Sequence, residues 1–269
     1  MPSDLISLKS GKEIESIELN LLINSKTLSK SQIVGLGDSL DEDEVDELIT
    51  KFELRSTLYK KPIYSIRNNR ISSNFTWHEI PEYFLCLYYS YFGAEDKTDG
   101  TGLFERISAQ ALRNFISGEV IVLGFPASVG FNENLDIIAR ACNEERGKPA
   151  ESAYKDDGVD IVAYKSFLDN RSSNLYILQQ CAAGIHWTQK KTIPIDRWLQ
   201  YIFWVRNNIT LSMATSEFVE NKDWQKKTTT YGILLDRLRI YNFLYQEAVE
   251  STLRGETLEW CRRKISEGL

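Results

Sequence analysis

The sequence contains an apolar segment that begins directly after several aspartates, and this pattern limits the folds that the chain can adopt. Asp156, Asp157 and Asp160 stand just before residues 161–163, which read Ile-Val-Ala. A short run of β-branched and small apolar residues predicts a buried strand. Such a strand has little reason to begin with charge, because an unpaired buried carboxylate is costly. The sequence therefore indicates a strand that begins at a polar site.

A second strand is expected at residues 175–181, joined to the first by a turn at 168–173. If the two strands are antiparallel, Asp160 lies near Gln180 at the same end of the pair. Side chains alternate between the two faces of a strand, so Asp160 and Lys165 are expected on opposite faces. Lys165 is therefore a poor candidate for a site that contains Asp160.

The oxygen donors at this strand end predict a magnesium site. The Asp160 carboxylate, the Gln180 amide and the backbone carbonyl of Cys181 are hard ligands, which suit Mg²⁺ and, as an alternative, Mn²⁺. Such a metal stabilises charge on a phosphate and lowers the pKa of a bound water. A structural zinc site is not expected, because the 4 cysteines and 2 histidines are widely spaced along the chain.

The stretch around Asp160 resembles the Mrr-like branch of the PD-(D/E)xK nucleases. The resemblance is carried by residues 157–163, which read Asp-Gly-Val-Asp-Ile-Val-Ala, by Gln180-Cys181, and by Phe104-Glu105 upstream. It covers residues 100–215. It implies a restriction-endonuclease-like core, metal-dependent hydrolysis of DNA, and Glu105 as a further metal ligand. Taken alone, Glu105 is equally compatible with a solvated or salt-bridged glutamate.

The sequence departs from that family at Ala182, where its pattern has a lysine. Some PD-(D/E)xK enzymes carry the lysine on the following helix, where this chain has Lys190 and Lys191; we prefer Lys190. An ammonium there orients the attacking water and offsets developing phosphate charge. If neither lysine acts, the site is degenerate or another residue substitutes. His186 is either a general base or a packing residue.

Further cations are candidates for phosphate contact. Arg237 and Arg239 follow Asp236 at an expected helix start, where they bind substrate phosphate with Lys191, or else flank a capping aspartate as exposed side chains. Residues 222–227 hold three lysines around a tryptophan. This segment either tracks a nucleic-acid backbone or is a solvated loop.

Two regions are predicted. Residues 1–95 form an N-terminal accessory region with α+β character, and residues 96–269 form the nuclease-like domain, with a polar, glycine-containing segment at the boundary. The mixed order of helices and strands after this boundary predicts an α/β fold, in which helices flank both faces of a mixed central sheet. Residues 187–205 are expected to be mainly helical, with the helix perturbed at Pro194. In the first region, residues 58–71 suit a short hairpin or loop.

Composition bounds the partners. No run approaches the roughly 18 consecutive apolar residues of a membrane span, so no membrane partner is expected. The first residues lack a basic segment followed by an apolar one, so we expect no signal peptide and a cytoplasmic protein. The net charge of -6 argues against a general nucleic-acid coating protein. It leaves room for a local basic rim that binds phosphates.

Two functions stay open. The first is a Mg²⁺-dependent DNA endonuclease, which the family resemblance associates with bacterial restriction or antiphage defence; cutting both strands with one site per chain favours a homodimer. The second, motivated by Ala182, is a catalytically inactive nuclease-fold module that binds nucleic acid or serves as a subunit of a larger defence complex. An unrelated hydrolase is disfavoured, since the sequence has no GxSxG, P-loop or HExxH motif.

Overall fold

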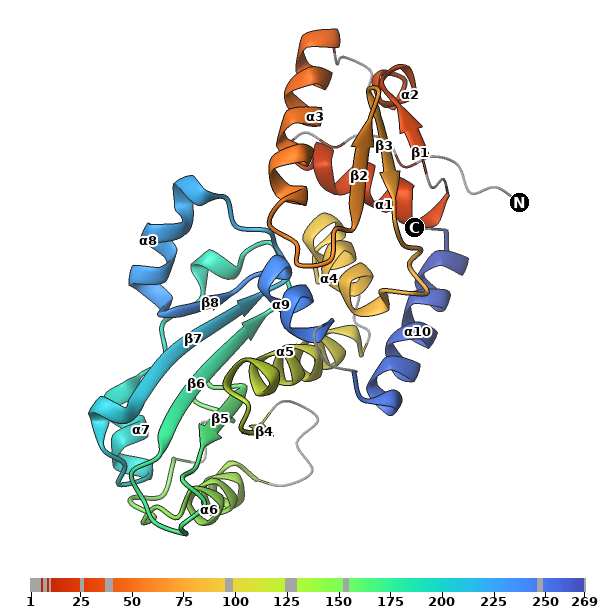
Figure 1. Cartoon of the computed structure of the whole chain (residues 1–269). Helices are drawn as coiled ribbons and strands as arrows, with labels where there is room; N and C mark the ends of the chain where they lie inside the picture. Colours follow the sequence, from red (N-terminus) through yellow and green to blue (C-terminus); the bar gives the residue numbers. More distant parts are fainter. Residues whose placement is uncertain are drawn as a thin grey trace.

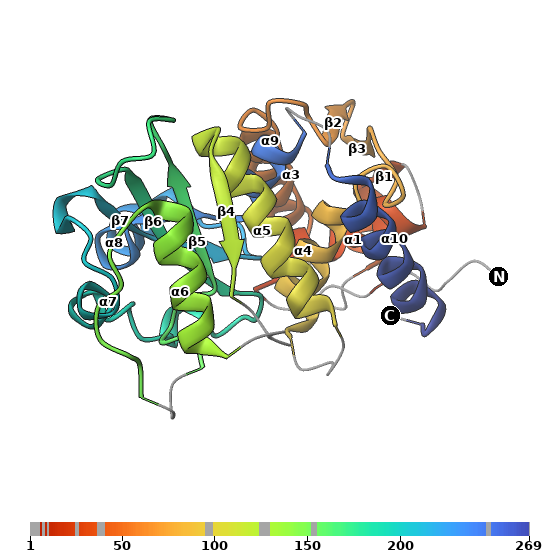
Figure 2. The same cartoon turned by 90° about the horizontal axis from the view of Figure 1, so that it is seen from below.

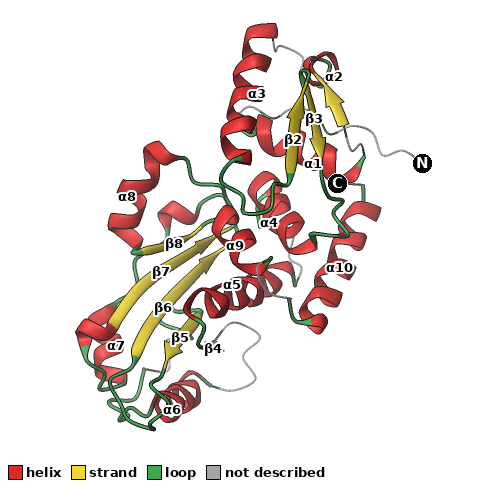
Figure 3. Ribbon diagram, viewed as in Figure 1, coloured by secondary structure: helices red, strands yellow, loops and turns green. Residues whose placement is uncertain are grey.

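A five-stranded mixed sheet contains the two strands predicted around Asp160. The structure, a computed structural model, describes residues 6, 9, 11–24, 27–36, 41–94, 99–123, 130–151, 155–245 and 249–268. The strands are β4 (Glu119–Val122), β5 (Ile161–Lys165), β6 (Leu175–Ala182), β7 (Ile209–Thr215) and β8 (Ile233–Leu235), in that spatial order (Figures 1 and 3). β4, β5 and β6 pair antiparallel, whereas β6, β7 and β8 pair parallel.

Helices cover both faces of this sheet. α5 (Gly100–Ile116) packs on the face that carries Ile161, Ile177 and Cys181. α6 (Phe131–Cys142) and α7 (Ile195–Tyr201) pack on the opposite face, with Val162 and Leu178. The remaining elements of this part are η1 (Trp187–Gln189), η2 (Arg206–Asn208), α8 (Asn221–Tyr231), α9 (Arg237–Leu244) and α10 (Ser251–Ser266). The α/β class with a mixed, helix-flanked sheet is thus confirmed.

The N-terminal part is a small α+β layer. Its antiparallel sheet has the order β1 (Thr27–Ser29), β3 (Arg70–Ser73) and β2 (Tyr64–Arg67). Its helices are α1 (Glu13–Ile23), α2 (Lys30–Val34), α3 (Glu42–Ser56) and α4 (Pro81–Phe92). The β2–β3 hairpin turns through Asn68 and Asn69, which both have positive φ, 51° and 57°, the backbone that a two-residue hairpin turn requires.

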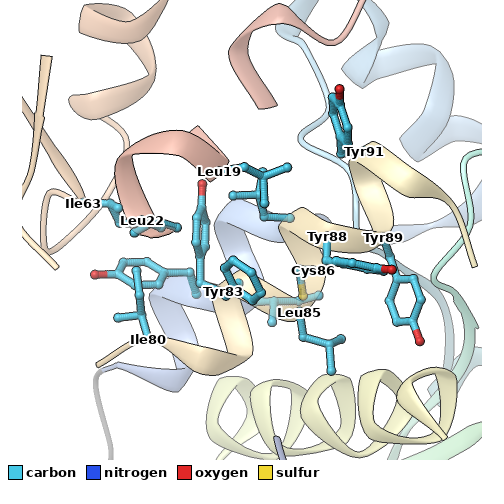
Figure 4. Packing of buried hydrophobic residues seen from close by; sticks show 14 of the residues in the cluster. Leu19, Leu22, Ile63, Ile80, Tyr83, Leu85, Cys86, Tyr88, Tyr89 and Tyr91 are labelled. Atoms are coloured by element: carbon cyan, nitrogen blue, oxygen red, sulfur yellow. The ribbon is translucent and has the colours of Figure 1, made fainter. Parts of the chain in front are cut away.

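One hydrophobic core joins the two regions. Buried residues of α1 and α4 belong to the same cluster as those of α5 and α10. Figure 4 shows Leu19, Tyr83 and Leu85 within this cluster, and Figure 2 shows α5 between the sheet and the helices α4 and α10. The buried core therefore runs across the predicted boundary between residues 95 and 96. No described helix has both the length and the apolar character needed to cross a membrane.

The segment at residues 187–205 differs from the expectation of a mainly helical region. It contains one short 3-10 turn, η1, and the seven-residue α7, with an extended stretch between them. Pro194 precedes α7 and supplies no backbone N–H, which limits helix to the residues after it. This extended stretch brings Lys190 back toward the end of β6.

Candidate functional site

The candidate site lies where β5 begins and β6 ends. The backbone N–H of Cys181 donates to the Asp160 carboxylate at 2.6 Å. The backbone N–H of Asp160 donates to the carbonyl of Gln179, the residue that pairs with Ile161. Two successive residues therefore face one partner, as in a β-bulge. The bulge turns the Asp160 carboxylate out of the simple alternation expected along β5.

Glu105 of α5 lies near Asp160. α5 begins at Gly100, where a Cβ atom would collide with Tyr89 and Trp260, so a residue without a side chain lets the helix start close to α4 and α10. Burial, and next the negative charge of Asp160, raise the pKa of Glu105 to about 8. The helix thus brings a second carboxyl group to the strand end, and this group is mostly protonated at neutral pH.

Opposing effects shift the pKa of Asp160. Burial raises its pKa, while the Cys181 N–H and the ammonium of Lys190 stabilise its charged form. The charge of Asp156 opposes ionisation of both Asp160 and Glu105. Asp156 was not a predicted site residue; its place before Gly158, in the acidic segment that opens β5, was the available signal.

Lys190 brings a cation to the same place. Its Nζ donates to the backbone carbonyl of Cys181 at 2.6 Å, and its charge lowers the pKa of both Glu105 and Asp160. Lys191 is exposed. The structure therefore places Lys190 at the carboxylates, and the carbonyl expected to bind metal accepts a hydrogen bond from this lysine.

A pocket of about 630 Å³ opens beside these groups. Glu105, Lys190 and His186 contribute polar side chains to its wall. Its apolar wall is made of Phe92, Phe104, Ile185 and Trp187. Phe92 and Ile185 are each 38% exposed, so the pocket presents apolar surface to solvent beside a charged cluster. That combination is typical of a ligand site.

Gln180 does not join this cluster, contrary to expectation. Regular alternation along β6 points it to the face opposite Cys181, where it borders a cavity of about 10 Å³ with Ile193 and Tyr231. Its Oε1 is buried without a hydrogen-bond partner. Only Asp160 is turned by the bulge, so the two side chains expected to share a metal lie toward different faces of the sheet.

Asp157 serves the turn before β5. Its carboxylate accepts hydrogen bonds from Arg197 Nε at 2.8 Å and from the Tyr201 hydroxyl at 3.0 Å, both on α7. Asp157 and Gly158 both have positive φ, 45° and 78°, which makes the tight turn that sets up the bulge. Asp157 therefore shapes the turn before β5.

Arg237 is not a substrate contact, contrary to expectation. It is completely buried and forms ion pairs with Glu15 and Glu18 of α1, at 3.2 and 3.0 Å. Asp236 caps α9 by accepting the N–H of Arg239 at 3.0 Å, as the alternative expected, but neither arginine is exposed as that alternative also expected. Arg239 is half-buried, and its guanidinium lies 4.4 Å from the centre of the Trp224 ring.

The donor set fits a hard divalent cation that keeps several of its waters. Two carboxyl groups, Glu105 and Asp160, meet beside the Cys181 carbonyl, and Mg²⁺ binds through one or two carboxylates plus substrate phosphate. Among the described residues, no cluster of three His, Cys, Asp or Glu side chains could hold a metal. A site here therefore depends on backbone, water or substrate oxygens.

Comparison of the chain with protein-family models, with curated proteins and with solved structures gives no match. The function of the molecule is therefore inferred from its own side chains and their arrangement.

Proposed function

We propose that this protein is a divalent-metal-dependent nuclease that hydrolyses phosphodiester bonds in DNA. The observation that carries the proposal is the cluster of Glu105, Asp160 and Lys190, of which Glu105 and Lys190 line one pocket. Paired carboxylates hold a metal, and a neighbouring ammonium attracts the phosphate that the metal also binds. In this proposal, α5, β4, β5 and β6 form a restriction-endonuclease-like core.

The three residues of the cluster have different roles, which follow from their charges. Asp160, fixed by the Cys181 N–H, would be one anionic ligand of a divalent cation. Glu105 would become a second ligand on releasing its proton. A Mg²⁺ ion held by these groups would supply charge stabilisation and an activated water. Lys190 places its positive charge where negative charge develops on the phosphate.

A second candidate function is a catalytically inactive nuclease-fold module in a larger defence complex. Ala182 and the placement of Gln180 on the opposite face favour it, because Ala182 lacks the lysine of the family pattern and the Gln180 amide points away from the carboxylates. In this case the acidic pair and the pocket bind nucleic acid or a partner without cleaving it. Under the first candidate function, the protein is a homodimeric enzyme of restriction or antiphage defence.

Plasmid cleavage separates the two candidates. We expect the wild-type protein to nick or linearise supercoiled plasmid with Mg²⁺ or Mn²⁺, and Asp160→Asn to lower the rate by about 100-fold or more. Asp169→Asn, in the exposed turn between β5 and β6, is the matched control and keeps wild-type activity. Cleavage that survives Asp160→Asn contradicts the proposed site. DNA binding without any wild-type cleavage supports the inactive module.

A further inference from the structure

Helix α8 presents lysines beside the candidate site. Lys222 and Lys226 are exposed, and Lys227 is half-buried with its Nζ 5.3 Å from the centre of the Trp187 ring. Among the described residues, no carboxylate forms an ion pair with any of these three lysines. Figure 1 shows α8 beside β8, the edge strand of the large sheet. Within the described part of the chain, the lysines of this helix thus form a positively charged surface without partner charges.

The same surface is continuous with the pocket. The Tyr231 hydroxyl, at the end of α8, donates to the carbonyl of Thr188 at 2.9 Å. The Tyr231 ring lies 5.7 Å from that of Trp187, which lines the pocket. Lys190 and Lys191 follow within the same segment of chain. A cationic path therefore leads from the ammonium at the carboxylates, past Trp187, onto α8.

The path has a net positive charge, whereas the whole chain has a net negative charge. Residues 185–191 and 220–231 contain five lysines and two carboxylates, whereas the whole chain has a net charge of -6. One of the two carboxylates, Glu220, is engaged by Arg55 at 2.6 Å. A local cation excess on an acidic protein attracts a polyanion and concentrates it at that face.

We propose that α8, together with Lys190 and Lys191, binds the sugar-phosphate backbone of DNA and leads it into the pocket. Lys222 and Lys226 are one helical turn apart and contact phosphates along one strand, while Lys227 links them to Trp187. These contacts are independent of base identity, since they reach phosphates only. The inference deepens the proposed function, on which it rests for the identity of the partner.

Salt dependence of DNA binding tests this surface without cleavage. A fluorescent duplex of about 20 base pairs is titrated with protein in EDTA at several salt concentrations, using wild type and Lys222→Ala/Lys226→Ala/Lys227→Ala. Each phosphate that the protein no longer neutralises lowers the slope of log affinity against log salt by about 0.9, so we expect a drop of about 2 to 3. Lys60→Ala/Lys61→Ala/Lys148→Ala removes the same charge from exposed positions elsewhere and serves as the control.

The outcomes separate this inference from the nuclease proposal. A slope that changes equally in both triple variants, or in neither, overturns the surface, as does wild-type protein that binds no duplex. Reduced slope in the α8 variant alone supports it, whether or not the wild-type protein cuts plasmid. Conversely, cleavage abolished by Asp160→Asn with an unchanged α8 slope leaves the nuclease proposal standing and removes this one. Circular dichroism of each variant checks that the exposed substitutions preserve the fold.

Discussion

Among single residues, Glu105 has the most informative chemical property, which is its raised pKa. Its ordinary pKa of 4.5 rises to about 8, first through burial and then through the charge of Asp160. Between these two pH values the folded protein keeps a proton that the unfolded chain has released. The free energy of unfolding therefore falls as pH rises through this window. A cation that binds beside the protonated Glu105 carboxyl group favours its ionised form.

The first prediction concerns Glu105→Gln in metal-free buffer. Because glutamine does not titrate, the variant lacks the loss of stability that the carboxyl group produces between about pH 5 and pH 8. Urea unfolding with EDTA at several pH values measures this loss for both proteins. We expect the stability of the wild type to fall more steeply with pH than that of the variant. Parallel curves for the two proteins contradict the raised pKa.

The second prediction separates the two adjacent lysines. Lys190→Ala removes the cation bonded to the Cys181 carbonyl and should lower kcat by roughly 100-fold or more, as loss of a transition-state charge partner does. Lys191→Ala should raise KM and leave kcat near the wild-type value, because Lys191 is exposed and, in the proposed complex, contacts the DNA backbone only. Steady-state cleavage of a fluorescent duplex measures both constants. Equal loss of kcat in the two variants speaks against the assignment of Lys190.

At the element scale, the strand pair was predictable and its bulge was not. Alternating and apolar residues identify β5 and β6 from local sequence, and their register agrees with a shared strand end for Asp160 and Gln180. The direction of the Asp160 side chain depends on which carbonyl its backbone N–H finds on the neighbouring strand. That choice is a tertiary event, set in part by the turn at Asp157 and Gly158. Sequence alternation alone therefore misplaced one of the two side chains.

The contact between α9 and α1 shows a second limit of local reasoning. An arginine at a helix start is usually solvated, yet Arg237 is completely buried because Glu15 and Glu18 lie opposite it. These partners are distant in sequence, with separations of 222 and 219 residues. By contrast, the hairpin turn at Asn68 and Asn69 involves only neighbouring residues, and a short hairpin was one of the two structures expected for residues 58–71.

The third prediction follows from this buried cluster. Arg237→Met leaves Glu15 and Glu18 without their shared cation in a dry environment, so we expect a loss of about 3 to 5 kcal/mol in the free energy of unfolding. Urea denaturation near neutral pH measures it. Arg262→Met removes an arginine whose side chain is 59% exposed and should change stability by less than about 1 kcal/mol. An equally small change in the free energy of unfolding of both variants contradicts the prediction. It would mean that water already solvates the charges of the cluster.

At the scale of the whole molecule, the two predicted regions share one core. Residues of α1 and α4 are buried with residues of α5, α9 and α10 in a single cluster, and the Arg237 ion pairs cross the same junction. The N-terminal layer therefore supports α5, the helix that carries Glu105. Sequence composition changes at residues 94–102, but a change of composition does not reveal which surfaces pack together.

The fourth prediction is that these regions unfold together. Since separating them exposes a large apolar surface, differential scanning calorimetry should show one transition with equal calorimetric and van't Hoff enthalpies. Lys12 and Glu217, an ion pair at 2.8 Å across the junction, should contribute little because both side chains are partly exposed. Two resolved transitions contradict the single cooperative unit.

In the proposed site, Glu105 and Asp160 together hold a divalent cation. Isothermal titration of the metal-free protein with Mn²⁺ near neutral pH, in buffers of different ionisation enthalpy, measures affinity and proton release at once. We predict saturable binding that releases about one proton, from Glu105, and that is abolished by Asp160→Asn. Absence of saturable binding, or binding unchanged by Asp160→Asn, contradicts the claim.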